Sequence, residues 1–459
     1  MRNRSIALGS ALMMVSALSL SSVNAFAAVK HPAKRVVLTV ATVNNSQMVQ
    51  MEQLTRKVFE KQNPNIVVKF VTLPENELRP KVTEDVATNA GKFDVVTIGN
   101  YEAPIWARNG WISNIGSQLR RLPAGVRKAY DYADLIRPIM NSLSYHQSAY
   151  ALPFYGESSM LMYNKTMFAA HHLKMPLHPT WAQVAKLAKT LNNPKQGVSG
   201  IVMRGLAGWG MNLAPLDTVI NTFGGEWFNM RWKPQMTSPA TERAVTFYVD
   251  LLRKYGEPSA ATTGFQQATS LMAQGKAGMF YDATSLAGVL ETPSTSKIAG
   301  HVGFAYAPTA ATAHGSHWLW SWALAMVKDS RHKAAALKWM MWATSPHYLV
   351  LAGKTFGWEN VPPGTRYSIY HNPQYLKAAP FAKVTLNSID TATPLHPTLH
   401  PVPYTGVQFV EIPQFETAGQ EVSQDVSAAI AGTMGVKQAL QEANSQLAAQ
   451  VTPKSVKGY

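Results

Sequence analysis

Residues 35–43 read RVVLTVATV and begin the alternation of strands and helices that decides the fold. The run is apolar and rich in β-branched residues, which indicates a buried strand. A helix is expected over about residues 46–62, and NPNIVVKFVTL (63–73) predicts a turn and a second strand. Residues 76–100 then predict a helix, a turn and a third strand. This β-α-β-α-β order predicts an α/β fold built on a parallel sheet.

Beyond this run, amphipathic helices alternate with short strands and loops. Further helices are expected at residues 179–193, 241–256, 332–345 and 435–451. Thr180 is the expected N-cap of the first of these helices. Residues 200–205 (GIVMRG) predict a strand, and residues 264–288 predict a helix, a strand and a turn. No internal repeat interrupts this organisation.

The first 27 residues have the layout of a secretory signal peptide. Arg2 and Arg4 precede an apolar run, and Ala25-Phe26-Ala27 matches the small-residue pattern of a cleavage site. The apolar run is short for a membrane span and contains serines, which favours cleavage over anchoring. The chain has no cysteine, so lipid attachment and disulfides are not expected, and a large core must stabilise it. A soluble periplasmic protein is therefore predicted.

Composition points to a globular protein of two or three domains, or one large two-lobed body. The chain has 459 residues, of which 46% are hydrophobic and 15% charged. Its formal net charge of +16 raises the question of nucleic-acid binding. The basic residues are scattered, however, and the densest patch, Arg120, Arg121, Arg127 and Lys128, is interrupted by Leu-Pro-Ala-Gly. A solvated basic surface is favoured, and no nucleic-acid partner is expected.

Two stretches imitate catalytic motifs but lack a residue that the chemistry requires. AGKT (352–355) ends like a phosphate-binding loop, but Tyr348 stands where the first glycine should be. GESSM (156–160) resembles a nucleophile elbow, but Met160 replaces its second glycine. Neither stretch therefore predicts an enzyme.

Metal and acid–base chemistry have weak support in the sequence. His396 and His400 have the ligand spacing of a helical metal site, but a proline follows each of them and opposes a helix. No metal and no cofactor is therefore expected. Glu157 and Asp282 could form the carboxylate pair of a glycoside hydrolase if they face one another, and this remains the enzymatic alternative.

Five stretches share one composition: a polar or charged group beside aromatic residues and glycines. They are FYGESS (154–159), MRGLAGWGMN (203–212), FYDATS (280–285), HWLWSW (317–322) and FGWENVPPGTR (356–366). Carboxylates accept hydrogen bonds from hydroxyl groups, and a guanidinium group donates them in a fork. Flat aromatic faces cover C–H surfaces. The mixture indicates recognition of a small polyhydroxylated molecule.

Each of these groups also has a structural interpretation. Glu157 could cap a helix, Arg204 could form an ion pair with an acid across the sheet, and Asp282 could cap the helix that follows it. Trp318, Trp320 and Trp322 alternate as on one face of a strand, and one or two of them are expected in the core.

The sequence resembles the family 1 extracellular solute-binding proteins of ABC transporters, with polyol binders as the nearest subgroup. The resemblance rests on LPFYGESSMLMYNK, MRGLAGWG, FGGEWFNMRW, FYVDLLRKYG, WLWSWALA, GWENVPPGTR and HPVPYTGVQFVEIPQF, and it extends from about residue 36 to 450. It implies two α/β lobes, each a central sheet flanked by helices, with a ligand cleft between them. After the signal peptide (1–27), it places residues 36–150 and 278–330 in the first lobe, and 151–277 and 331–459 in the second.

The resemblance also implies a set of ligand-binding residues and no catalytic ones. The first strand's end, with Asn45, and stretches in both lobes supply them: Asn44, Gln47, Tyr101, Tyr155, Glu157, Arg204, Trp209, Asp282, Trp320 and Trp358. Glu157 is expected on the second lobe, where the chain leaves the first crossing, facing the cleft, with Tyr155 packed beside it.

The function implied is capture of a linear polyol such as mannitol, sorbitol or arabitol by hinge closure, followed by delivery to the membrane subunits of an ABC permease. A monomer without cofactor is expected. The alternatives are a mono- or oligosaccharide-binding protein of the same class, a secreted glycoside hydrolase and a polyanion-binding protein.

Overall fold

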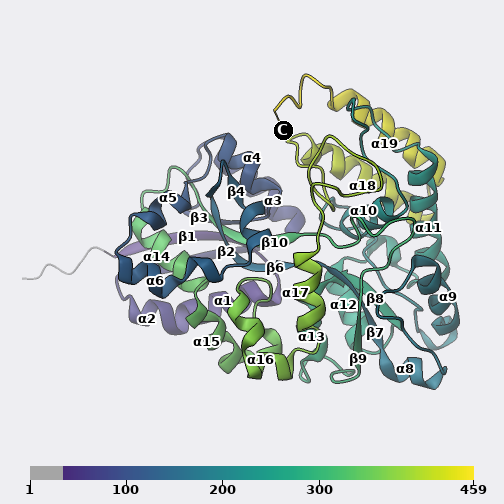
Figure 1. Ribbon diagram of the computed structural model, residues 1–459, viewed down its shortest axis with the longest axis horizontal. Helices are drawn as coiled ribbons and strands as arrows, with labels where there is room; N and C mark the ends of the chain where they lie inside the picture. Colours follow the sequence, from purple (N-terminus) through teal and green to yellow (C-terminus); the bar gives the residue numbers. More distant parts are fainter. Residues whose placement is uncertain (1–34, 459) are drawn as a thin grey trace, which may run out of the picture.

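The computed structural model describes residues 35–458, and these form two lobes of unequal sheet size (Figure 1). The predicted signal peptide lies outside the described residues. The first lobe contains a five-stranded sheet of order β2-β1-β3-β10-β6. Its strands are β1 (Val36–Val43), β2 (Ile66–Leu73), β3 (Val95–Ile98), β6 (Ala151–Glu157) and β10 (Trp320–Met326).

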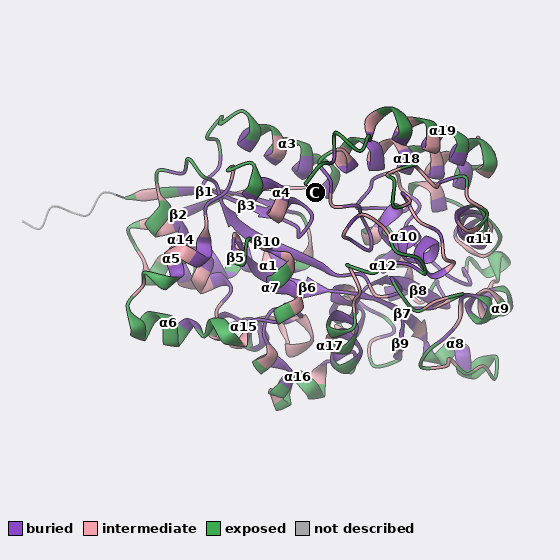
Figure 2. Cartoon of the chain, turned by 45° about the horizontal axis from the view of Figure 1, so that its top comes forward, coloured by how far each residue is buried: buried purple, intermediate pink, exposed green. Residues whose placement is uncertain are grey.

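The first three strands confirm the parallel sheet expected from sequence. β1 pairs in parallel with β2 and β3, and every residue of β3 is buried. β10 then pairs antiparallel with both β3 and β6, so the sheet is mixed. All seven residues of β6 and of β10 are buried, because helices cover both faces of the sheet (Figure 2).

Helices and turns flank this sheet, and several follow it in sequence. They are α1 (Ser46–Leu54), η1 (Thr55–Phe59), α2 (Glu60–Gln62), α3 (Glu75–Ala87), α4 (Glu102–Arg108), α5 (Ile115–Arg120), α6 (Ala124–Tyr130), η2 (Tyr132–Asp134), α7 (Arg137–Ser142), the small hairpin β4 (Ser144–Tyr145) and β5 (Ser148–Ala149), α14 (Lys333–Ala343) and α15 (Pro346–Phe356). Asn45 caps α1 by accepting a hydrogen bond from the Met48 amide, at 3.0 Å.

The second lobe contains an antiparallel sheet of order β8-β7-β9. Its strands are β7 (Ser159–Asn164), β8 (Met279–Ala283) and β9 (Val302–Tyr306). Around it lie α8 (Lys165–Ala170), α9 (Trp181–Leu191), η3 (Pro194–Gln196), α10 (Leu213–Thr222), α11 (Pro239–Tyr255), η4 (Ala260–Thr262), α12 (Phe265–Ala273), η5 (Thr284–Leu286), α13 (Ala287–Glu291), α18 (Phe415–Ala431) and α19 (Val436–Gln450).

The four later helices predicted from sequence are present as α9, α11, α14 and α19. The capping prediction at Thr180 is also confirmed, because its hydroxyl accepts from the Gln183 amide while the Gln183 side chain accepts from the Thr180 amide. The strand predicted at residues 200–205 was wrong. Ser199 and Val202 make isolated parallel bridges to Ala277 and Phe280, so the segment runs beside β8 without forming a continuous strand.

The strand pairing departs from the lobe limits expected from the resemblance. β8 and β9, expected in the first lobe within 278–330, pair with β7 in the second sheet. Residues 151–157, expected in the second lobe, form the edge strand β6 of the first sheet, and α14 packs against β10, β1 and β6. The chain therefore crosses between the sheets at Ser158 and again between β9 and β10.

A last crossing runs through segments in the lower middle of Figure 1, where α17 stands between the two lobes. It comprises η6 (Trp358–Asn360), η7 (Tyr367–His371), α16 (Pro373–Ala378) and α17 (Ala382–Asp390). Here Gly364, at φ +65°, lies against β6, and the Gly156 amide donates to the Pro363 carbonyl at 2.9 Å. Because neither glycine has a side chain, the two backbones can touch beside the first crossing.

Candidate functional site

A polar, aromatic-lined cavity lies between the two lobes and contains about 550 Å³ of space that no protein atom fills, part of which is open to solvent. Its walls come from both sheets and from the segments that cross between them. The lining side chains used below are Asn45, Gln47, Glu75, Arg79, Tyr155, Glu157, Arg204, Trp209, Phe265, Ser285, Trp318, Trp320, Trp322 and Gln408.

Glu157 is the last residue of β6 and pairs in register with Trp320 of β10. Its side chain is only 6% exposed, and it accepts a hydrogen bond from the Ser285 hydroxyl of the second lobe. Burial raises the pKa of Glu157 to about 8, although the Ser285 hydrogen bond and nearby Arg204 oppose the rise. A carboxyl group thus lies on the cavity wall where it can exchange hydrogen bonds with a ligand hydroxyl.

Arg204 forms a buried ion pair with Asp282, as the structural interpretation of its sequence predicted. The guanidinium Nε lies 2.9 and 3.1 Å from the two carboxylate oxygens, and Nη1 donates to the Gly210 carbonyl at 2.8 Å. Burial alone would lower the pKa of Arg204, but Asp282 raises it above its usual value. Arg204 lines the cavity, whereas Asp282 is fully buried behind it and does not.

This pair removes Asp282 from the carboxylate pair that the hydrolase alternative proposed. A glycoside hydrolase needs two carboxyl groups that face the same space. Asp282 does not line the cavity, and its oxygens accept from Arg204 and from the Ala283 amide. Glu157 therefore has no carboxylate partner in Asp282.

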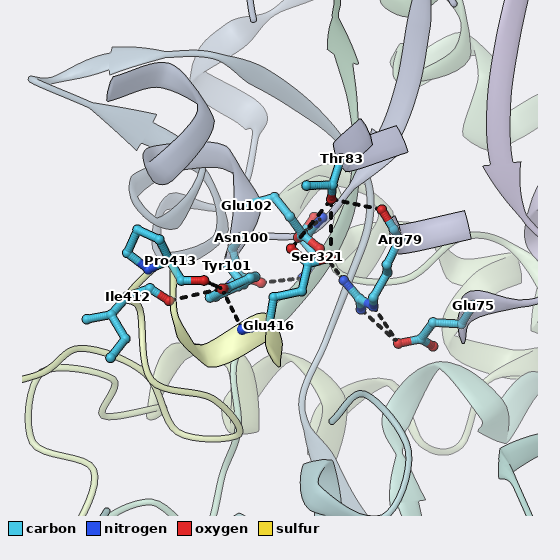
Figure 3. Close-up of polar contacts among 11 residues, drawn as sticks. Glu75, Arg79, Thr83, Asn100, Tyr101, Glu102, Ser321, Ile412, Pro413 and Glu416 are labelled. Carbon is cyan, nitrogen blue, oxygen red and sulfur yellow. Dashed lines mark hydrogen bonds and ion pairs between the residues drawn. The ribbon is translucent and has the colours of Figure 1, made fainter. Parts of the chain in front are cut away.

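Arg79 forms a second buried charge cluster on the opposite wall (Figure 3). It pairs with Glu75 one helical turn earlier, at 2.7 Å, and with Glu102. Its guanidinium carbon lies 4.0 Å from the centroid of the Trp209 ring. Burial alone would lower the pKa of Arg79, but Glu102 and Glu75 raise it above its usual value. The cation is fixed by charge pairing and by aromatic contact at once.

Tryptophan rings form most of the apolar wall. Trp320 and Trp322 lie on β10 with ring centroids 5.5 Å apart, and Trp209 meets Trp320 edge-on at 6.0 Å. The alternation seen in the sequence does place Trp320 and Trp322 toward the same space. Trp318, just before the strand, is fully buried but also lines the cavity.

Two polar atoms on the wall are buried without a partner among the described residues. They are Oε1 of Gln408 and Nε1 of Trp318, an acceptor and a donor. Nearby polar groups are already engaged: Asn45 donates to the Tyr155 hydroxyl, and Gln47 donates to the Ser285 carbonyl, each at 3.0 Å. Unpaired buried polar atoms cost free energy, which a ligand with hydroxyl groups would recover.

The structure brings six of the ten predicted site residues to the cavity wall and leaves four outside it. Gln47, Tyr155, Glu157, Arg204, Trp209 and Trp320 line the cavity. The other four, Asn44, Tyr101, Asp282 and Trp358, lie outside the cavity wall.

Asn44 is exposed beside it, and only its backbone carbonyl contacts the second lobe, through Gln266 at 3.1 Å. Trp358 packs against Gly353 of α15. The stretch that follows it packs against β6, where the Thr365 hydroxyl donates to the Phe154 carbonyl. Asp282 lies behind Arg204. Tyr101 is buried behind Trp209, at 5.0 Å between ring centroids.

Sequence reasoning missed several lining residues, namely Glu75, Arg79, Phe265, Ser285, Trp318, Trp322 and Gln408. Glu75 and Arg79 have the i, i+4 spacing of an ordinary surface pair on a helix. The alternating tryptophans were a usable signal for Trp318 and Trp322. Gln408 belongs to a loop with no periodicity, so its sequence context contains no local signal.

The described residues contain no group of three or more His, Cys, Asp or Glu side chains that could hold a metal ion. Within residues 35–458, no helix combines the length and apolarity of a membrane span.

Fold and cavity together define a two-lobed binding protein that encloses a small molecule between its lobes. The family model of the bacterial extracellular solute-binding proteins matches residues 44–348, and the chain belongs to this family. The mannitol-binding protein of Pseudomonas aeruginosa is 44% identical over 416 residues, which cover 90% of this chain and 93% of that protein.

Solved structures agree with this assignment. An ABC transporter solute-binding protein from Agrobacterium vitis, with bound D-mannitol, is 48% identical and has a TM-score of 0.87, covering 90% of this chain and 97% of that one. A solute-binding protein from Agrobacterium radiobacter in complex with ribitol has a TM-score of 0.79 at 22% identity, covering 92% of this chain and 100% of that one. The second likeness shows the fold alone.

Proposed function

We propose that this protein is the periplasmic binding component of an ABC importer and captures a linear polyol, with D-mannitol as the first candidate. The observation that carries the proposal is the inter-lobe cavity with its unpaired donor and acceptor, Trp318 Nε1 and Gln408 Oε1. The mannitol-binding relatives support the choice of ligand.

The chemistry of the wall suits an acyclic polyol. Glu157 and Glu75 can accept hydrogen bonds from hydroxyl groups, and the guanidinium groups of Arg79 and Arg204 can donate them. The tryptophan faces cover the C–H surfaces of the carbon chain. A flexible polyol loses rotamer freedom on binding, so several such hydrogen bonds are needed to offset that cost.

The lobes are in direct contact, as expected of the closed form of a hinge-closing protein. Gln47 and Glu157 of the first lobe both bond to Ser285 of the second, and the Asn76 side chain donates to the Ala207 carbonyl at 3.2 Å. A ligand that contacts both walls stabilises this arrangement over an open one. The closed protein then presents one joint surface to the permease subunits.

Binding without turnover, a monomeric state and export by the predicted signal peptide complete the proposal. No nucleic-acid partner is included, since the basic residues are scattered. The wall also suggests that the ligand is uncharged. Arg79 and Arg204 are each already neutralised by buried carboxylates, so no cation is left to receive an anionic group.

Isothermal titration calorimetry on protein lacking residues 1–27 tests the proposal, with mannitol, sorbitol, arabitol, xylitol and the parent sugars as ligands. Binding of one or two polyols, with much weaker binding of the cyclic sugars, is the expected result. Binding of sugars alone would replace the polyol with a saccharide. Failure of every polyol and sugar to bind a protein shown to be folded by circular dichroism would overturn the proposal.

Glu157→Ala provides the matched variant. We expect it to lose mannitol binding while it keeps the far-UV spectrum and cooperative unfolding of the wild type. Incubation of mannitol with the wild-type protein, followed by nuclear magnetic resonance of the supernatant, should return unchanged mannitol. A new product would contradict the assignment as a binding protein.

A further inference from the structure

Tyr101 belongs to the first lobe, but its ring lies in a socket made by the second. It follows β3 at the start of α4, and it is only 2% exposed. Three rings of the second lobe surround it edge-on: Trp209 at 5.0 Å, Phe409 at 5.5 Å and Phe415 at 6.1 Å between centroids. Edge-to-face packing at these distances is the favoured arrangement of aromatic pairs.

The hydroxyl group of Tyr101 completes the start of a helix in the other lobe (Figure 3). It donates to the Ile412 carbonyl at 3.0 Å and accepts from the Glu416 amide at 3.1 Å. Glu416 is in the first turn of α18, where amides have no partner within the helix, and Gln414 supplies no side-chain cap. The first lobe therefore provides the hydrogen bond that α18 lacks.

A second contact lies beside the first. The Thr83 hydroxyl of α3 is 3.2 Å from a carboxyl oxygen of Glu416, which is itself largely shielded from solvent. Together, Tyr101 and Thr83 join two elements of the first lobe to the first turn of α18. We call these two residues and Glu416 the α18 latch.

The α18 latch is one ring away from the cavity. Tyr101 does not line the cavity, but Trp209 does, and Trp209 contacts both the Tyr101 ring and the Arg79 guanidinium. If the lobes part, Trp209 loses both of these contacts with the first lobe. The position of this wall and the closure of the lobes are therefore coupled through shared contacts.

We infer that Tyr101 is a positioning residue, which stabilises the closed form through α18 and holds Trp209 in place without touching the ligand. The expected effect of Tyr101 on affinity rests on the proposed function, whereas its expected effect on lobe closure does not. Protein–protein contacts that exist only in the closed state raise the closed population even without ligand. Apparent affinity rises with that population.

The test is a measurement of lobe separation in Tyr101→Phe, which keeps the ring and removes the hydroxyl. Because the chain has no cysteine, Lys57→Cys and Lys195→Cys introduce one spin label on an exposed site of each lobe. Double electron–electron resonance then gives the inter-lobe distance distribution with and without mannitol. Calorimetry on the unlabelled proteins gives the Kd for mannitol.

We expect Tyr101→Phe to shift the ligand-free distribution toward longer distances and to raise the Kd about tenfold, as the loss of one or two buried hydrogen bonds predicts. The mannitol-saturated distribution should match the wild type. Thr83→Val should act in the same direction. Tyr130→Phe is the control, because it removes a buried hydroxyl bonded to Thr344 within the first lobe, and it should change neither quantity.

The outcomes separate the two proposals. If mannitol fails to bind the wild type, the proposed ligand is wrong, and the ligand-free distributions alone decide the role of Tyr101. Identical ligand-free distributions would then overturn the α18 latch. If mannitol binds, an unchanged Kd in Tyr101→Phe overturns it. A raised Kd with a ligand-free distribution like the wild type also overturns it, because that pattern marks direct contact with the ligand.

Discussion

At the scale of the residue, the cavity wall combines charges that are already paired with polar atoms whose partners are missing. The charges of Arg204 and Arg79 are paired with carboxylates, whereas Gln408 Oε1 and Trp318 Nε1 have no partner among the described residues. The first kind fixes the shape of the wall, and the second kind is free to select a ligand. Glu157 belongs to both kinds. The Ser285 hydroxyl donates a hydrogen bond to it, and burial raises the pKa of its carboxyl group.

Gln408→Leu should weaken mannitol binding at least about tenfold without lowering stability. An unsatisfied buried oxygen is costly in the ligand-free protein, and an apolar group of similar size removes that cost. The measurements are calorimetric titration and urea unfolding. Gln446→Leu on α19 is the control, because its Oε1 is likewise unpartnered but lies away from the cavity. A variant that binds like the wild type would remove Gln408 from the proposed site.

Glu157 should make the stability of the ligand-free protein depend on pH. Its pKa is about 8 when folded and near its ordinary 4.5 when unfolded, so the folded state binds more protons between these values. The free energy of unfolding should therefore fall as pH rises from about 5 to 8, by on the order of 1 kcal/mol per pH unit. Its contribution is complete at low pH and is lost as pH rises through 8.

Glu157→Gln isolates this effect, because an amide does not titrate but can still accept from Ser285. Urea unfolding at pH 5 and pH 8 should show a smaller decrease for the variant than for the wild type. An equal decrease in the free energy of unfolding for the variant and the wild type between pH 5 and pH 8 would contradict a raised pKa at Glu157.

At the scale of the element, the sequence predicted what is local and missed what depends on distant pairing. Helices such as α9 and α11 could be predicted from their amphipathic spacing and, for α9, from the N-cap residue Thr180. The lobe to which a strand belongs is not local. β10 enters the first sheet antiparallel, some 220 residues after β3, and nothing in its own seven residues distinguishes the two sheets.

The same distinction applies to the predicted site. Glu157 and Trp209 lie in stretches that composition singled out, and the family resemblance then assigned them to the ligand. Glu75 and Arg79 were missed because their spacing is typical of a solvated helix face, and only tertiary packing turns that face toward the cavity. Tyr101 and Asp282 were placed one layer too near the ligand, since sequence does not distinguish a residue on the wall from one behind it.

Gly156→Ala should destabilise the protein by about 1–3 kcal/mol, the usual cost of overpacking. A Cβ at Gly156 would lie 2.7 Å from the Gly364 carbonyl oxygen and 2.7 Å from Ile139 Cδ1. Urea unfolding gives the value. Gly125→Ala is the control, because nothing lies within 4 Å of its Cβ position in α6 and the change should be neutral or slightly stabilising. Equal stability of both variants would contradict the tight contact between β6 and the last crossing.

At the scale of the whole molecule, a strongly basic protein has a cavity whose two arginines are each paired with carboxylates. The formal net charge of the sequence is +16, but Arg79 is paired with Glu75 and Glu102, and Arg204 is paired with Asp282. The surface can attract acidic partners over a distance, but the interior offers no spare cation. Surface charge and ligand charge are therefore independent in this protein.

Mannitol 1-phosphate and mannonate should bind at least about 100-fold more weakly than mannitol, because a buried anion without a counter-charge is strongly disfavoured. Competition calorimetry measures the ratio. In Glu75→Gln, Arg79 loses one of its two carboxylate partners, so the ratio of the Kd for the anions to the Kd for mannitol should become smaller. Anion binding equal to that of mannitol in the wild type would show that the wall does offer a cation to the ligand.

The first crossing passes through a single residue, Ser158, between the end of β6 and the start of β7. In a rigid-body rotation, displacement grows with distance from the axis, and Glu157 is adjacent to a point through which that axis must nearly pass. We therefore expect Glu157 to move little when the lobes part, whereas the contacts of Tyr101 with α18 join the two lobes and must break. Glu157 can thus meet a polyol in the open form, before the contacts of Tyr101 have formed.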